Sequence, residues 1–555
     1  MIGAALLFSQ ALSLLDAPSW SLDSGVTEKD GRFVVTTDAT TRAWGTVATT
    51  PLHGEIAAGD TVTVHARLRS ASRMRVGLAV EGTQPEAWVL AGSRRLSAGW
   101  QEVRYAGVAI RPFPSGSAHL SLWLGYGPGA FEIRDVRVEN LGEKPLAELD
   151  LTQDPYGGEP NPDDWRKAAE RRIEKIRKGD LTVQVLDATG KPVRGASVHV
   201  HQLRHAFQFG TAAPASLLAR EDETGERFRA TLARLFNTVT FENDLKWSPL
   251  DDVRKPDVEK AFAWFAKEGI VARGHNLVWG SRQWAPRGLW EKSDEGIREA
   301  IKARIARAVA RYKGRVYLWD VVNEAVSEHE LWDRIGWEWF DESFRLAHAA
   351  DPAVRLAYND FDLTEESSSG PGHLTRAKAL IQRLIDAKAP FDTIGIQSHV
   401  LTPITPTKRV LGILDELARY GKRLEITEYD LSLLDDEAHG RHMADYLTAC
   451  FSHPAVDAFI VWGFWEGSHW RAAQGGAMFR RDWTPRPAAL AYEDLVKRRW
   501  WTDATLRSDA KGKVRLRAFY GTHRIAVGGT TADFSLAKGG PAATTIRLLE
   551  TAHVR

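Results

Sequence analysis

Eight short apolar segments, each followed by a helix-like stretch, dominate the middle of the chain. They are Phe207–Ala212, Asn237–Glu242, Ile270–Trp279, Val316–Glu324, Arg355–Asn359, Thr393–His399, Arg423–Asp430 and Ala458–Phe464. Alternation of this kind is typical of parallel βα units, and eight units predict an α/β fold, a (β/α)8 TIM barrel, over residues 207–498. A doubly wound sheet is the alternative, but no GxGxxG loop follows the first segment.

Residues 17–142 instead alternate apolar and polar positions, as half-buried strands do. The clearest segments are Thr61–Leu68, Gln101–Ile110, Ala118–Leu124 and Phe131–Glu139. Turn-forming Gly, Ser, Pro and Asp residues separate them, which predicts a jelly-roll-like β-sandwich before the barrel.

Two shorter β-like stretches flank the predicted barrel. Leu181–His201 alternates around a Thr-Gly-Lys-Pro turn, and Lys513–Tyr520 and Arg524–Val527 do so near the other end. We expect residues 181–206 and 499–555 to pack together as a small accessory β domain. Residues 143–180 are predicted to be a linker followed by a helix, because Asp154–Asp164 is rich in Pro, Gly and Asp.

The first 16 residues have two interpretations. Met1–Leu15 is uncharged and contains the apolar stretch Ile2–Phe8, but it lacks the basic residues of a typical export signal. It is either a clipped signal, which implies a secreted or periplasmic protein, or an ordinary apolar segment. No other uncharged apolar run approaches 18 residues, so no transmembrane span and no membrane partner are expected.

Composition narrows the classes of partner. Lys plus Arg is 73 and Asp plus Glu is 72, a balance without the basic excess of nucleic-acid binding. The single cysteine, Cys450, excludes an intramolecular disulfide and a cysteine metal cluster. His201 and His205 are four apart, but in a strand that spacing indicates coincidence, so neither a metal site nor a cofactor is predicted. The 21 tryptophans favour flat, weakly polar ligands such as sugars.

Polar residues gather where the barrel hypothesis places the catalytic face. Glu324 ends the fourth strand and Glu428 the seventh, so the two carboxylates lie across the barrel from each other. A glycosidic bond needs one acid to protonate the leaving oxygen and a second carboxylate, either as nucleophile or as base for water. Asp430 lies on the same side of its strand as Glu428, and we expect His399 to bridge the two.

A set of motifs makes the interpretation more specific. The segments are Phe236–Trp247 (FNTVTFENDLKW), Arg273–Trp279 (RGHNLVW), Trp319–Ala325 (WDVVNEA), Ile394–His399 (IGIQSH), Ile426–Asp430 (ITEYD) and Val461–Gly463 with Trp470. In this order they resemble glycoside hydrolase family 10. The resemblance implies a cofactor-free retaining enzyme that cleaves internal β-1,4 bonds of xylan, with Glu324 as acid/base and Glu428 as nucleophile.

The resemblance also implies roles for other residues. His399 and Asp430 would support the nucleophile, and Asn323 would bind the 2-hydroxyl of the sugar. The implied substrate-binding residues are Glu242, Asn243, Lys246, His275, Trp279, Asn323, Gln397, Trp462 and Trp470. A retaining site further predicts that the two carboxyl groups lie about 5–5.5 Å apart.

The chain departs from the family pattern after RGHNLVW. Gly280-Ser281-Arg282 stands where the family usually has His-Ser-Gln, and that histidine normally contacts the sugar at the cleavage site. Either the pocket accepts a decorated or different sugar, or Arg282 fills the gap. A related β-glycanase and an exo-acting enzyme therefore remain alternatives. Trp465-Glu466 also replaces a smaller residue and Asp.

The predicted sandwich resembles family 4/22-type carbohydrate-binding modules, mainly in strand layout and in Phe131–Val138. Trp44, Trp88, Trp123 and Tyr126 are candidate platform aromatics, although core packing is the favoured interpretation for each. A polysaccharide-binding protein with a silent barrel is the alternative from another functional class. We expect a monomer whose partner is a xylan-type polysaccharide.

Overall fold

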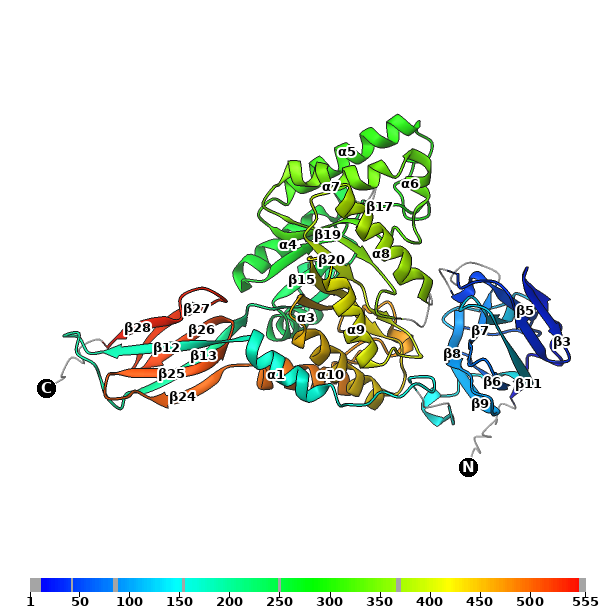
Figure 1. Cartoon of the computed structure of the whole chain (residues 1–555), viewed down its shortest axis with the longest axis horizontal. Helices are drawn as coiled ribbons and strands as arrows, with labels where there is room; N and C mark the ends of the chain where they lie inside the picture. The colour runs from blue at the N-terminus through cyan, green and yellow to red at the C-terminus, as the bar shows by residue number, and fades with distance from the viewer. Residues whose placement is uncertain are drawn as a thin grey trace, which may run out of the picture.

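The structure is a computed structural model that describes residues 11–40, 43–82, 88–151, 155–247, 251–365 and 371–548. A β-sandwich near the N-terminus, a central αβ barrel and a pair of small sheets near the C-terminus follow one another along the long axis (Figure 1). Among the described residues, no helix combines the length and the apolar character needed to cross a bilayer.

The N-terminal sandwich consists of two antiparallel sheets. Their orders are β3-β4-β11-β6-β9, with β1 beside β11, and β2-β5-β10-β7-β8. The strands are β1 (Leu12–Ser13), β2 (Ser21–Leu22), β3 (Val26–Lys29), β4 (Arg32–Val35), β5 (Val47–Pro51), β6 (Thr61–Arg69), β7 (Arg75–Gly82), β8 (Trp88–Arg95), β9 (Gln101–Val108), β10 (Ala118–Trp123) and β11 (Gly129–Asn140). Alternate side chains fill the space between the sheets, where Phe33 stacks on Phe131 at 4.9 Å.

The last residues of the segment Met1–Leu15, which the sequence left as either a signal or an ordinary apolar stretch, belong to this sandwich. Leu12 and Ser13 pair with Asn140 and Glu139 of β11, and Leu14 is fully buried in the sandwich core. The remainder of the apolar stretch, Ile2–Phe8, lies outside the described residues.

The predicted TIM barrel is confirmed. Its parallel sheet closes through pairing of its first and last strands, β14 and β23. The strands are β14 (Gln208–Ala213), β15 (Thr238–Phe241), β16 (Val271–Gly274), β17 (Val278–Trp279), β18 (Val316–Asn323), β19 (Arg355–Asp360), β20 (Thr393–Ile396), β21 (His399–Val400), β22 (Arg423–Leu431) and β23 (Val456–Val461). Two predicted strands are interrupted, which gives β16 with β17 and β20 with β21, and β23 begins two residues earlier than its apolar run suggested.

Helices alternate with these strands and cover the outside of the barrel. They are α2 (Ala215–Ala219), α3 (Glu223–Leu235), α4 (Asp251–Glu268), α5 (Asp294–Arg311), α6 (Glu330–Ile335), α7 (Glu338–Ala350), α8 (Pro371–Asp386), α9 (Thr407–Ala418), α10 (Asp436–Ser452) and α11 (Pro487–Asp494). Local sequence sets several starts, since Asp222, Ser293 and Asp435 each accept a backbone N–H from the first turn.

A helix and two small sheets adjoin the barrel. Helix α1 (Arg166–Ile176) follows the linker and contacts α10. The sheets have the orders β25-β12-β28 and β24-β13-β26-β27. Their strands are β12 (Lys178–Leu186), β13 (Ser197–His205), β24 (Asp503–Arg507), β25 (Lys513–Phe519), β26 (Gly521–Val527), β27 (Thr530–Leu536) and β28 (Ala543–Arg547). Strands from before and after the barrel thus share one apolar core (Figure 1).

Candidate active site

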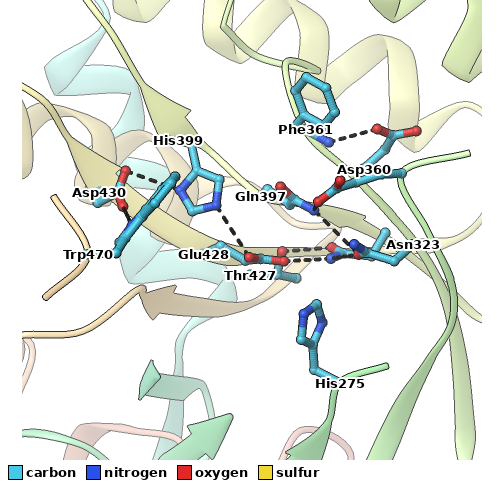
Figure 2. A network of polar contacts seen from close by, with 12 residues as sticks. His275, Asn323, Asp360, Phe361, Gln397, His399, Thr427, Glu428, Asp430 and Trp470 are labelled. Atoms are coloured by element: carbon cyan, nitrogen blue, oxygen red, sulfur yellow. Dashed lines mark hydrogen bonds and ion pairs between the residues drawn. The ribbon is translucent and has the colours of Figure 1, made fainter. Parts of the chain in front are cut away.

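Glu428 lies near the carboxyl end of β22, and histidine and amide groups surround its carboxylate. His399 Nε2 lies 3.3 Å from Oε2, and Asn359 Nδ2 donates to Oε1 at 2.7 Å. Burial alone would raise the pKa of Glu428, but His275 and His399, with the hydrogen bond from Asn359, lower it to about 2. The carboxylate is therefore held ionised. Figure 2 shows His275 and His399 on opposite sides of it.

A second carboxylate holds His399 in place. His399 Nδ1 lies 3.1 Å from Asp430 Oδ1, so the imidazole spans Glu428 and Asp430 (Figure 2). Burial opposes the charged imidazole, but the two carboxylates outweigh it and raise the pKa of His399 to about 9. The bridging position expected for His399 agrees with this geometry, and the imidazolium counters both carboxylates.

Glu324 follows the last residue of β18 and has a different environment. It is partly exposed, and Gln397 Nε2 donates to its Oε1 at 2.8 Å. Desolvation by the surrounding protein raises the pKa of Glu324 to about 7, and the nearby Glu428 and Asp360 charges act in the same direction. Its backbone lies in the left-handed region with φ of 58°, a strained conformation that is common at functional sites. This carboxyl can hold a proton at neutral pH.

Three amide side chains connect the two glutamates. Asn359 Nδ2 donates to Asn323 Oδ1 at 2.9 Å as well as to Glu428, and Gln397 Nε2 lies 3.4 Å from the same Asn323 oxygen. Thr427 Oγ1 donates to Asn359 Oδ1 at 2.8 Å and orients that amide. All three amides are almost fully buried. The network therefore fixes the positions of both carboxylates relative to Asn323.

His275 is held by a buried ion cluster inside the barrel. Its Nδ1 lies 2.8 Å from Asp320 Oδ2, and Arg273 forms a bidentate pair with the same carboxylate. Arg273 Nε also bonds to Glu425 at 3.1 Å. His275 is thus a buried, partnered histidine that also contributes to the field at Glu428.

Residues after β15 form one side of the site. Lys246 Nζ donates to Asn243 Oδ1 at 2.9 Å and lies 5.1 Å from the Trp279 ring. Burial raises the pKa of Glu242, partly offset by Lys246. The charge of Glu428 also raises the pKa of Glu242, which places Glu242 within electrostatic reach of Glu428.

Two tryptophans from the end of β23 and its loop contact His399. Trp462 is buried and lies 6.1 Å from the His399 ring, whereas Trp470 is half exposed and lies 5.0 Å from it. Trp470 Nε1 donates to Asp430 Oδ2 at 2.6 Å. Arg471 also bonds to Asp430, at 3.1 Å, and lies over the Trp470 ring.

The departure at Gly280 has a steric cause. A Cβ at this position would lie 2.3 Å from the backbone oxygen of Glu328, in the loop after β18. No histidine fits there unless that loop moves. The Arg282 guanidinium lies 5.5 Å from the centroid of the Trp290 ring, and the Arg282 backbone N–H bonds to Glu330 at the start of α6.

The second departure, Trp465-Glu466, is explained by packing. Trp465 stacks on Trp483 at 4.6 Å and is almost fully buried, and its Nε1 donates to Arg481 O. Glu466 lies 3.3 Å from Arg486. These residues stabilise the loops after β23.

Sequence reasoning did not single out two residues that the site contains. Asn359 was seen at the end of the fifth strand, but only the fold reveals that it joins Asn323 to Glu428. Arg471 directly follows Trp470, and this position next to a predicted substrate-binding residue is the sequence feature that could have identified it.

Residues 200–495 match Glycosyl hydrolase family 10. The chain is 29% identical over 65% of its length to Anti-sigma-I factor RsgI6 of Acetivibrio thermocellus, and 27% identical over 65% to Endo-1,4-beta-xylanase 1 of Arabidopsis thaliana. It spans 46% and 38% of those two proteins, less than half of each. Endo-1,4-beta-xylanase 3 of Hypocrea jecorina is 30% identical over 55% of this chain and 86% of its own length. The match covers more than half of the chain, which therefore belongs to glycosyl hydrolase family 10.

Proposed function

We propose that the chain hydrolyses internal β-1,4-xylosidic bonds of xylan-type polysaccharide with retention of configuration. Glu428 attacks the anomeric carbon while Glu324 protonates the leaving oxygen. The glycosidic C–O bond breaks, a glycosyl–Glu428 ester forms, and the leaving sugar departs with the proton of Glu324.

The second step reverses these roles. Ionised Glu324 removes a proton from water, whose oxygen attacks the anomeric carbon and releases Glu428. Two displacements restore the original configuration. Asn323 binds the sugar 2-hydroxyl, and Glu242, Asn243 and Lys246 hold the sugar on the non-reducing side. Protein carboxylates supply all the chemistry, so the proposal requires no cofactor.

The opposite electrostatic states of the two glutamates carry the proposal. Burial and nearby carboxylates raise the pKa of Glu324 to about 7, whereas the two histidines lower the pKa of Glu428 to about 2. Paired carboxyl groups whose pKa values are pushed apart are the signature of an acid and a nucleophile.

A polysaccharide panel with stereochemical analysis tests the proposal. Xylan, mixed-linkage glucan and cellulose are incubated with the full chain, and products are separated by chromatography while proton NMR follows the first anomer released. We expect short xylo-oligosaccharides that appear first as the β-anomer. Release of the α-anomer, or binding of xylan without product, would contradict the proposal and, in the second case, favour a silent polysaccharide-binding barrel.

A decorated substrate or exo action is the second candidate, and Gly280 favours it. The family histidine is absent and the Glu328 backbone lies against that position, so the sugar pocket differs there. Arabinoxylan, glucuronoxylan and aryl xylosides should be compared with undecorated xylan. Faster cleavage of a decorated xylan supports the altered pocket, and release of one product size from chain ends supports exo action. Restoring histidine is a poor test, because its Cβ would clash.

We also propose that the sandwich, residues 17–142, binds sugar on the outer face of its β2-β5-β10-β7-β8 sheet. Trp44, Trp88 and Trp123 cluster there, with ring centroids 5.3–5.6 Å apart, away from the core between the sheets. Trp88 is 37% exposed and presents an aromatic surface. In affinity electrophoresis with xylan, Trp88→Ala should weaken retention of the full chain. Trp100→Ala, which changes a ring packed between Arg69 and Arg134, is the matched control.

A polymeric substrate cannot enter a cell, so we propose a secreted or periplasmic location and action as a monomer. Cell fractionation and size-exclusion chromatography test these two points.

In the electrophoresis experiment, equal retention of Trp88→Ala and the unmodified chain would contradict sugar binding by the sandwich. It would leave the proposal for the barrel intact.

A further inference from the structure

The solvent-facing side of strand β13 carries a group of metal-ligand side chains that the catalytic proposal does not use. His199 and His201 are two residues apart on this strand, and Asp503 of β24 lies in register with His201. Successive odd positions of a strand project from one face, so both imidazoles lie beside the Asp503 carboxylate. The ligand atoms of the three side chains all lie within 4.8 Å of one another.

The contacts within this group converge on one carboxylate. His199 Nε2 lies 2.7 Å from Asp503 Oδ1, and His201 Nδ1 lies 3.1 Å from Oδ2. Metal ligands must be deprotonated, and an aspartate carboxylate meets that requirement at neutral pH.

Neighbouring charges are already neutralised. Arg524 of β26 lies in register with His201, but its Nε and Nη2 donate to the Asp533 carboxylate at 2.8 and 2.9 Å. Trp501 flanks His201 on another side, with ring centroids 6.3 Å apart. The face therefore offers two imidazole nitrogens and a carboxylate without a competing free cation among these neighbours.

We propose that His199, His201 and Asp503 bind one divalent transition-metal ion of the zinc type, which links the strand that enters the barrel to the strand that leaves it. Two nitrogens and one oxygen suit zinc, which often takes three protein ligands with water in the fourth position. Zinc–ligand bonds of about 2.0–2.2 Å require ligand atoms about 3.3 Å apart. The side chains are 43–56% exposed, so small rotations bring the ligand atoms to this spacing.

This site differs from the pair that the sequence suggested. His205 stands four residues after His201, but a β-bulge between Gln202 and Arg204 reverses the alternation of the strand. His205 is consequently buried, with Nε2 near Val496 O, and burial lowers its pKa to about 3. His205 therefore lies on the buried side of the sheet, away from His201, whereas the i,i+2 spacing places the imidazoles of His199 and His201 on one face.

The linkage has a structural consequence. His201 and Asp503 are 302 residues apart in sequence and bracket the whole barrel. An ion that binds the folded chain but not the unfolded one stabilises the fold by an amount that grows with the logarithm of the free-ion concentration above Kd. Zinc should therefore raise the melting temperature of the full chain. The proposal does not depend on the catalytic proposal, because it concerns the accessory sheet.

Binding is measured by calorimetry, with Zn²⁺ alone titrated into the tag-free, chelator-treated full chain. We expect one equivalent to bind, with affinity that falls as pH falls because protons compete for the imidazoles. His199→Ala, His201→Ala and Asp503→Asn should each weaken binding by about 10–100-fold or more, at least the cost of losing an outer-shell partner. The exposed positions make these variants suitable, and circular dichroism verifies that each one folds.

Two variants serve as matched controls. His65→Ala removes a histidine of the N-terminal sandwich that lies 3.0 Å from Glu102. This pair consists of one imidazole and one carboxylate, whereas the proposed site has two imidazoles. Asp180→Asn removes an exposed carboxylate from β12, in the neighbouring sheet. Both should keep the affinity and the zinc-dependent rise in melting temperature of the unmodified chain.

Absence of calorimetric binding would overturn the proposal. Equal binding by Asp503→Asn and the unmodified chain would do so as well, since the ion would then lie elsewhere. Loss of zinc binding in the three ligand variants, with zinc binding retained in both controls, would support the proposal whatever the activity of the barrel proves to be.

Discussion

The surroundings of Glu324 and Glu428 show how two residues of one type acquire opposite pKa shifts. Both side chains lie at strand ends of one barrel and share a network of amides. Glu428 faces two histidines and loses its proton readily, whereas Glu324 faces other carboxylates and retains one. Burial favours the neutral form at both sites, so the identity of the neighbours decides the outcome.

Removing each carboxylate should give the largest effect and separate the two roles. Glu428→Ala should abolish turnover of every substrate, because no covalent intermediate can form. Glu324→Ala should lose about 10²–10⁴-fold on xylan, whose leaving group needs protonation. Its glycosylation rate on an aryl xyloside with an acidic leaving group should fall much less, as pre-steady-state kinetics would reveal.

Glu466→Gln is the matched control for these variants, since Glu466 pairs with Arg486 in a loop after β23. It should retain xylan hydrolysis. Equal losses for Glu324→Ala on both substrate types would show that the assigned acid does not protonate the leaving group.

Removing the imidazole beside Glu428 should make the two environments more alike. His399→Asn removes a charge-assisted contact, which is worth about 1.5–3 kcal/mol, so kcat/KM should fall about 10–100-fold. The pKa of Glu428 should rise, and the acidic limb of the pH profile should move to higher pH. His329→Ala, which changes an exposed histidine paired with Asp333, should leave the profile unchanged.

The pH dependence tests the Glu324 environment. Glu324 must be protonated in the first step, so kcat/KM should fall about tenfold per pH unit above about 7, the pKa of Glu324. The Gln397 amide favours ionised Glu324, and Gln397→Ala should therefore move the basic limb to higher pH. A limb that moves to lower pH, or does not move, would contradict the role assigned to this hydrogen bond.

The smallest effect concerns the residues behind His399. Trp470→Phe keeps an aromatic ring but removes the N–H that donates to Asp430. We expect Trp470→Phe to lower kcat/KM severalfold. Trp470→Ala should lower it further, because the aromatic surface for the sugar is lost as well. Steady-state kinetics on xylan measure both, and a larger loss in Trp470→Phe than in Trp470→Ala would contradict this ranking.

Periodicity was sufficient for the barrel because parallel strands buried on both faces leave apolar runs of strand length. It was less accurate where strands break: the run Ile270–Trp279 forms β16 and β17 with a gap between them. Sequence also named the glutamates and His399, since polar residues at the ends of buried strands stand out. It could not show that Asn359 joins Asn323 to Glu428, because that contact connects three different strands.

The sequence by itself determined the family, the αβ barrel and the residues offered to its catalytic face, because strand length, alternation and motif order are local properties. The tertiary structure decided which neighbours each titratable group meets, and therefore which glutamate keeps its proton. It also decided that Glu328 closes over Gly280 and that His199, not His205, lies beside His201. Contacts between distant strands, and a single bulge, set these outcomes, and neither can be read from local pattern.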